Sequence, residues 1–74
     1  MNNLGHEELR KRHSQLLDYQ ETIHPFTATI REMGEVWGMK STASVRYTLD
    51  KLIELDAVIV RTHDKKSQYF AVIT

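Results

Sequence analysis

The sequence contains no cysteine among its 74 residues, and this absence excludes disulfide bonds, thiolate metal sites and thiol catalysis together. Long hydrophobic runs are also missing. The longest covers residues 69–73, far short of the roughly 20 residues that a membrane-spanning helix needs. No basic segment followed by an apolar one suggests export, so we expect the protein in the cytoplasm and away from membranes.

The length of the chain bounds its class. Domains are rarely smaller than about 50 residues, so residues 1–74 are expected to form a single domain. Hydrophobic residues make up 41% of the chain and charged residues 27%, which is typical of a globular domain with a small core. Such a size favours a binding module and argues against an elaborate enzyme.

Charge of one sign does not dominate, because ten basic residues balance ten acidic ones. Their distribution is uneven. Residues 1–37 carry four basic and six acidic side chains, or −2, whereas residues 38–74 carry six basic and four acidic side chains, or +2. The difference is a weak indication of a basic face in the second half.

Hydrophobic periodicity predicts three helices. The first covers residues 6–23, with Leu9, Leu16, Leu17 and Ile23 on one face and His13 and Gln20 within the same stripe. Pro25, the single proline, ends this helix, and Phe26 in the following connection is expected to pack inward. The second helix is short and ends at Gly38.

The second helix is predicted to begin with a capping box, because Thr29 is followed three residues later by Glu32. Its residues Met33 and Trp37 are expected in the core. In the third helix, at about residues 41–55, Val45, Leu49 and Leu52 form the inner face. The outer face consists of small or polar residues: Ala43, Ser44, Arg46, Tyr47 and Asp50.

After a turn at Asp56, residues 57–61 and 68–73 read as two strands joined by a polar turn over residues 62–67. The predicted fold class is therefore mainly α with a small β-hairpin. Two short helices joined by a glycine-containing turn form a helix-turn-helix, and the hairpin makes it a winged one. In such a fold the third helix can enter the major groove of DNA, with the hairpin beside the phosphates.

Residues 29–41, TIREMGEVWGMKS, and residues 44–52, SVRYTLDKL, resemble the helix-turn-helix of LexA repressors. The resemblance covers about residues 9–72. It implies a winged-helix domain that binds double-stranded DNA in transcriptional repression and reads bases with the start of the recognition helix. The residues themselves suggest no cofactor or metal. Transferred to this sequence, the base-reading candidates are Ser41, Ala43, Ser44, Arg46 and Tyr47.

Arg46 is the strongest of these candidates, because a guanidinium can form two hydrogen bonds to guanine O6 and N7. Basic or hydroxyl side chains near the second and third helices and at the hairpin turn are the phosphate candidates, which would set affinity rather than sequence preference. They are Thr29, Arg31, Lys40, Lys51, Lys65 and Lys66.

The sequence departs from the LexA pattern in three respects. Ala43, Arg46 and Tyr47 replace the amide and carboxylates that read bases in well-known members, so the target site should differ. Asp56 stands where the family usually has glycine. The self-cleaving serine-lysine peptidase domain is absent, so the chain is either an isolated DNA-binding fragment or a small stand-alone regulator.

Several alternatives remain open at this level. Ser41 is a helix cap, a DNA contact, or both, and the Arg10–Arg12 segment reads as a solvated helix face. His6 and His13 lie roughly 10 Å apart along a helix, too far to bind one metal ion. A winged helix can also serve as a protein-interaction module with little DNA affinity. We expect a monomer or weak dimer that pairs on DNA, with half-sites about 34 Å apart or multiples of that.

Overall fold

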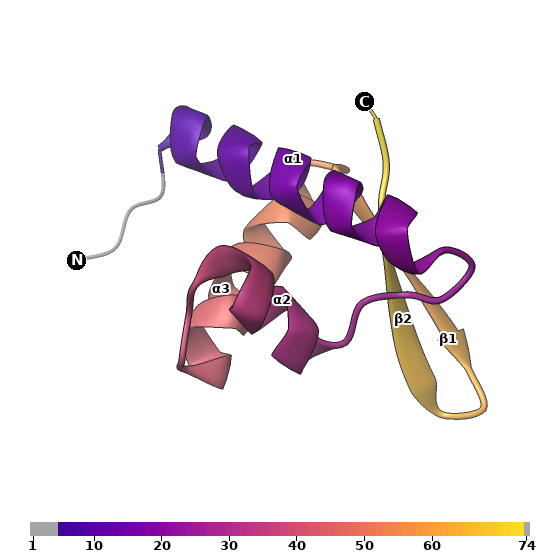
Figure 1. Ribbon diagram of the computed structural model, residues 1–74. Coiled ribbons are helices and arrows are strands. Elements are labelled where there is room, and N and C mark those ends of the chain that lie inside the picture. Colours follow the sequence, from indigo (N-terminus) through magenta and orange to yellow (C-terminus); the bar gives the residue numbers. More distant parts are fainter. Residues whose placement is uncertain (1–4, 74) are drawn as a thin grey trace.

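The computed structural model describes residues 5–73 and consists of three helices followed by a β-hairpin (Figure 1). Helix α1 (His6–Ile23) lies across the other two helices, α2 (Ile30–Trp37) and α3 (Thr42–Glu54). Strands β1 (Val58–His63) and β2 (Lys66–Ala71) pair antiparallel. This order confirms the predicted winged helix-turn-helix class. No helix within residues 5–73 has the length and apolar character to cross a membrane.

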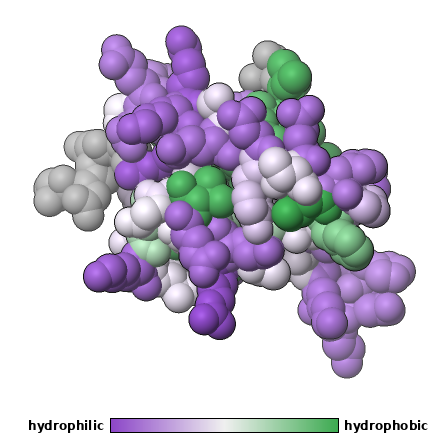
Figure 2. Space-filling model, viewed as in Figure 1, coloured by the Kyte–Doolittle hydropathy of each residue, from purple (hydrophilic) through white to green (hydrophobic). Residues whose placement is uncertain are grey.

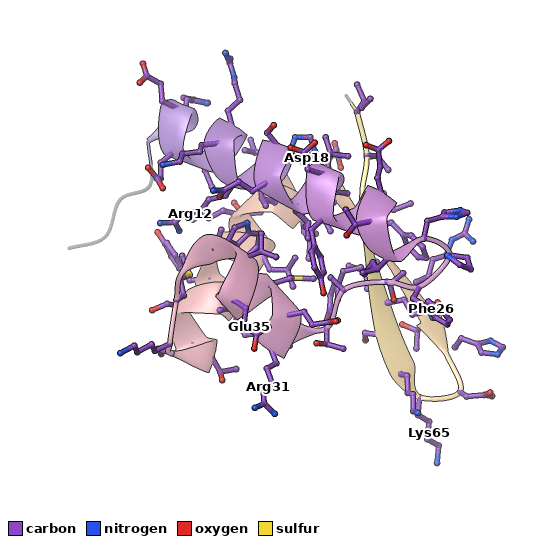
Figure 3. The ribbon with its side chains drawn as sticks, in the orientation of Figure 1. Arg12, Asp18, Phe26, Arg31, Glu35 and Lys65 are labelled. Carbon is purple, nitrogen blue, oxygen red and sulfur yellow. The ribbon has the colours of Figure 1, made fainter. Side chains whose placement is uncertain are left out.

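Helix α1 has the predicted bounds and directs Leu9 and Leu16 into the core, with Leu17 and Ile23 packed against it. The expectation for Phe26 was wrong, because this side chain is 75% exposed and points away from the connection between α1 and α2 (Figure 3). A turn closed by the Phe26 N–H donating to Ile23 O follows the helix directly. The residue of this connection that enters the core is the smaller Ala28, at 4% exposure.

The helix-turn-helix is held by its caps and by a close approach of its two helices. Thr29 and Glu32 form the predicted capping box, and Gly38 closes α2 in the left-handed conformation, with φ 69°. Gly34 lies at the closest approach, since a Cβ there would be 3.0 Å from Met39 O and 3.2 Å from Val45 Cγ2. The second helix, the turn over residues 38–41 and α3 therefore form one packed unit.

The strands lie closer to the turn than predicted, so residues 57, 72 and 73 fall outside them and the turn is tighter. Only Asp64 and Lys65 lie between the paired residues His63 and Lys66, and both have positive φ, 49° and 65°. A two-residue turn of this left-handed type matches the twist of the flanking strands, so pairing continues to its edge. Polarity had placed residues 62–67 in a loop, but six residue pairs, from Val58–Ala71 to His63–Lys66, form the ladder. Asp56 makes the predicted turn, with φ 59°.

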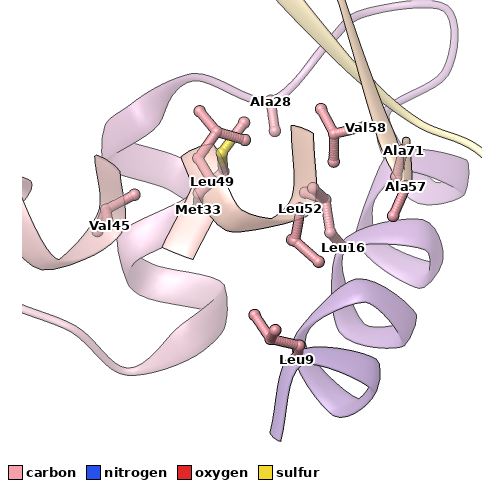
Figure 4. Close-up of a cluster of buried hydrophobic side chains, with 10 residues drawn as sticks. All are labelled: Leu9, Leu16, Ala28, Met33, Val45, Leu49, Leu52, Ala57, Val58 and Ala71. Atoms are coloured by element: carbon pink, nitrogen blue, oxygen red, sulfur yellow. The ribbon is translucent and has the colours of Figure 1, made fainter. Parts of the chain in front are cut away.

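The core receives side chains from every helix and from the hairpin (Figure 4). The largest fully buried ones are Leu16, Met33, Leu49, Leu52, Val58 and Thr48. Met33 is buried as predicted, whereas Trp37 packs on the edge of the core and donates from Nε1 to Arg12 O at 2.9 Å. Removal of this apolar surface from water is the main force that joins the hairpin to the helices.

Polar side chains of α1 hold the hairpin and α3 in place. The Gln20 amide donates to Ala71 O at 3.0 Å and accepts from Ala71 N at 2.8 Å, and His13 Nε2 lies 2.7 Å from Val72 O. Arg12 donates to Thr48 Oγ1 at 2.7 Å and to Glu8 at 3.1 Å. The reading of Arg12 as part of a solvated face was therefore wrong, because it contacts the one buried polar residue of α3.

Glu32 links α1 to the start of α2 and makes stability depend on pH. Its carboxylate accepts from Thr29 N at 2.9 Å and from the Tyr19 hydroxyl at 2.8 Å. The hydrogen bond from the Thr29 backbone, followed by that from Tyr19, lowers the pKa of Glu32 below its ordinary 4.5. Because the folded state favours the carboxylate, this contribution is present above pH 4.5 and is lost as pH falls through the lower folded pKa.

We expect Glu32→Gln to flatten the loss of stability in acid. The free energy of unfolding, measured with urea between neutral pH and about pH 3, should fall less steeply in this variant than in the parent. Glu35→Gln is the matched control, since Glu35 is an exposed residue of the same helix. Equal slopes for the parent and Glu32→Gln would contradict the role of the ionised Glu32.

Candidate nucleic-acid interface

The outer face of α3 is exposed along its first two turns. Val45, Thr48, Leu49 and Leu52 are buried, at the spacing of one face of a helix. The residues on the opposite face are exposed to solvent, as predicted: Ala43, Ser44, Arg46, Tyr47 and Asp50. Small side chains at the start of this face leave the backbone accessible to a ligand. The face thus has the shape that a recognition helix requires.

Arg46 and Tyr47 are held differently on this face. Arg46 forms no ion pair within 4.0 Å in the part of the chain that the structure describes, so its guanidinium is available to a ligand. Tyr47 is 40% exposed, and its ring lies under Lys51 Nζ, 5.5 Å from the ring centroid. This cation–π contact restricts the orientation of the Tyr47 ring, whereas within residues 5–73 no such contact holds the Arg46 side chain.

A groove of about 490 Å³ runs between α2 and the start of α3. Its lining combines two cationic side chains, Arg31 and Lys40, with the hydroxyls of Ser41 and Thr42. Glu35 also lines it, so its charge is mixed. Ser41 occupies the N-cap position of α3, but its side chain makes no cap hydrogen bond. Its hydroxyl is therefore available for a contact outside the helix.

The hairpin tip is the second basic feature. Lys65 and Lys66 are exposed beside His63 and Asp64, whose side chains approach to 3.3 Å between Nε2 and Oδ2. In Figure 2 the tip projects from the lower right as a hydrophilic extension. Figure 3 shows Lys65 and Arg31 extending from different elements toward the same side of the molecule. Cations from the hairpin and from α2 thus share one side.

The structure brings some of the predicted contacts together and separates others. Arg31, Lys40 and Ser41 line the groove, next to the exposed Ala43, Ser44, Arg46 and Tyr47 of α3. Lys65 and Lys66 lie apart, at the hairpin tip. Two candidates are occupied within the protein: the Thr29 hydroxyl accepts from Glu32 N at 3.1 Å, and Lys51 packs on Tyr47 and lies 3.9 Å from Glu54.

Two residues were not among the predicted contacts, Thr42 at the groove and Arg61 on the hairpin. Thr42, the first residue of α3, lines the groove beside Ser41. Arg61 of β1 is exposed, with its guanidinium carbon 5.7 Å from the centroid of the Phe70 ring. The hydroxyl of Thr42 was a visible signal, because it belongs to the same polar start of the helix. Arg61 could not be placed before the strand pairing was known.

Within residues 5–73, no three histidine, aspartate or glutamate side chains are grouped so that they could hold a metal ion. Comparisons with protein-family models, with curated proteins and with solved structures found no match.

Proposed function

We propose that this protein binds double-stranded DNA with sequence preference and acts in the cytoplasm as a transcriptional repressor. In this proposal α3 enters the major groove, and Ser41, Ala43, Ser44, Arg46 and Tyr47 face the base edges. The single observation that carries the proposal is the outer face of α3, which is exposed, small at its start and centred on Arg46. A helix of this shape fits the groove, and arginine is the commonest reader of guanine.

The surroundings of α3 support the proposal. Arg31 and Lys40 in the groove, and Lys65 and Lys66 at the hairpin tip, are cations that can contact phosphates. The likeness of residues 29–52 to the LexA motif points the same way. No catalytic step is part of this proposal, which assigns the protein binding alone. Pairing of two copies on DNA would extend the short site that one helix reads.

The alternative is a protein-interaction module, which the balanced charge of the chain favours. In vitro selection from a random duplex library at about 100 mM salt, followed by titration of the selected duplex against scrambled DNA, separates the two. An enriched motif whose affinity falls with salt supports the DNA-binding proposal. Absence of enrichment, with no salt-dependent binding, would reject it in favour of the alternative.

The double replacement Lys65→Ala with Lys66→Ala should weaken binding to selected and scrambled duplexes alike. Each lost phosphate contact makes the plot of log affinity against log salt less steep by about one, without a change in base preference. Fluorescence anisotropy titrations over a series of salt concentrations measure this slope. Lys11→Ala, an exposed residue of α1, is the control and should leave the slope unchanged. A changed base preference in the double variant would contradict the assignment of the two lysines to phosphates.

A further inference from the structure

The hairpin has two outer edges, and α1 supplies a hydrogen-bond partner to the edge of β2 at Ala71. Directly beyond the ladder, Val72 N donates to Ala57 O, so residues 57, 59, 61 and 63 direct their backbone groups toward β2. By the same alternation, residues 58, 60 and 62 of β1, and 67, 69 and 71 of β2, direct theirs outward. The pair His63–Lys66 next to the two-residue turn agrees with this assignment.

The outer edge of β2 is covered at Ala71, next to α1. Gln20 binds both the N–H and the C=O of Ala71, as a neighbouring strand would. Along β1, Val58 is buried at 1% exposure, but Val60 is 43% exposed and Thr62 is exposed. Within residues 5–73, the outward backbone groups of Ser67 and Tyr69 form no hydrogen bond beyond the hairpin, and neither do those of Val60 and Thr62 on the edge of β1. Such an edge can accept another strand.

The side chains around this edge combine apolar surface with positive charge. Ile59, on the outer face of the hairpin, is 42% exposed and is paired with Phe70. Arg61, two residues along the same face, packs its guanidinium over Phe70 at 5.7 Å. No ion pair joins Arg61 to another residue within the described chain. The outer face therefore presents an apolar side chain at Ile59 and, two residues further along the strand, the positive charge of Arg61 without an ion-pair partner within residues 5–73.

A second copy of the chain fits this edge poorly. Pairing of Val60 with Val60 of the copy would place Thr62 opposite Val58, whose edge is buried. Pairing of Val60 with Thr62 of the copy would place the two Arg61 side chains directly opposite each other, and like charges in that position are destabilising. The charge of the edge is complementary to an acidic segment instead.

We propose that the outer edge of β1 binds an extended peptide segment of a partner protein, which adds as a third strand and places an acidic side chain opposite Arg61 and an apolar one opposite Ile59. The backbone groups of Val60 and Thr62 supply the hydrogen bonds, and the Arg61–Ile59 spacing supplies specificity. This surface is independent of the outer face of α3, so the proposal does not rest on DNA binding.

The probe is a short, capped peptide of alternating valine and threonine with one central glutamate, labelled for fluorescence anisotropy. A matched peptide carries lysine in place of the glutamate. We expect the parent protein to bind the glutamate peptide at least about tenfold more tightly than the lysine peptide, as one hydrogen-bonded charge pair provides. Arg61→Glu should reverse this preference, and Arg10→Glu on α1, the control for net charge, should not.

Val60→Pro tests the backbone contact. The Val60 N–H points away from β2, so proline leaves the internal ladder intact and removes only the donor that the incoming strand needs. This variant should lose about tenfold in affinity for the glutamate peptide while its circular dichroism spectrum stays that of the parent. Amide exchange gives an independent readout in the parent protein, because Val60 and Thr62 should become protected when the peptide binds.

Three results would overturn the proposal. They are failure of the folded parent to bind the glutamate peptide, equal binding of both peptides by the parent, and protection confined to amides outside β1. Concentration-dependent dimerisation that Val60→Pro abolishes would assign the edge to a second copy instead.

Discussion

Replacing Arg46 by alanine is expected to reduce affinity for the selected duplex by about 1–3 kcal/mol, or roughly fivefold to more than a hundredfold. Arg46 is exposed on the outer face of α3 and forms no ion pair with another described residue. Its loss should therefore remove a DNA contact without disturbing the fold. The effect should be concentrated at one base position, where the variant no longer distinguishes guanine from the other bases.

The measurement is a titration of parent and variant against the selected duplex and against duplexes altered at single positions. The affinity for scrambled DNA should fall far less than the affinity for the selected duplex, because one cation contributes only part of the attraction to phosphates. Arg46→Lys is the informative control: it keeps the charge but not the planar fork that binds guanine through two hydrogen bonds. If Arg46→Ala lowered affinity equally for every duplex, Arg46 would be a phosphate contact and the proposed base reading would be wrong.

Leu49→Ala should have the largest effect on stability among the changes considered. Leu49 is 1% exposed in the core between α2, α3 and the hairpin (Figure 4), and truncation of such a residue costs about 2–5 kcal/mol. A domain of this size has only about 4–11 kcal/mol of stability in total. The variant should therefore unfold at a markedly lower temperature and contain a detectable unfolded fraction near body temperature.

Thermal unfolding followed by circular dichroism measures this loss. Ser44→Ala is the matched control on the same helix, because its side chain is exposed and its stability should change by no more than about 0.5 kcal/mol. A DNA-binding measurement also shows whether the effect of Leu49→Ala comes only from unfolding. Leu49→Ala should regain parental affinity once it is cooled enough to fold, because Leu49 does not reach the surface. An unfolding temperature equal to that of the parent would contradict the placement of Leu49 in the core.

The helical part of the fold followed from the sequence because its signals are local. Apolar residues spaced three, four or seven positions apart indicated α1 and the inner face of α3, and such spacings cover only one or two helical turns. Thr29, Glu32 and Gly38 fixed the ends of α2 through hydrogen bonds and backbone conformation within a few residues. The exposure of the predicted base-reading face followed in turn, since the positions between buried residues of a helix must point outward.

Other features were decided only by tertiary structure. Arg12 meets Thr48 across 36 residues, and Gln20 meets Ala71 across 51, so neither contact had a local signal. The length of the hairpin depended on the left-handed turn at Asp64 and Lys65, which polarity alone read as a longer loop. Phe26 stayed outside because the small Ala28 occupies the core position in that connection. The sequence determined which segments form helices and which faces are apolar, whereas packing decided which edges and side chains stay available to a partner, because burial depends on neighbours far away in the chain.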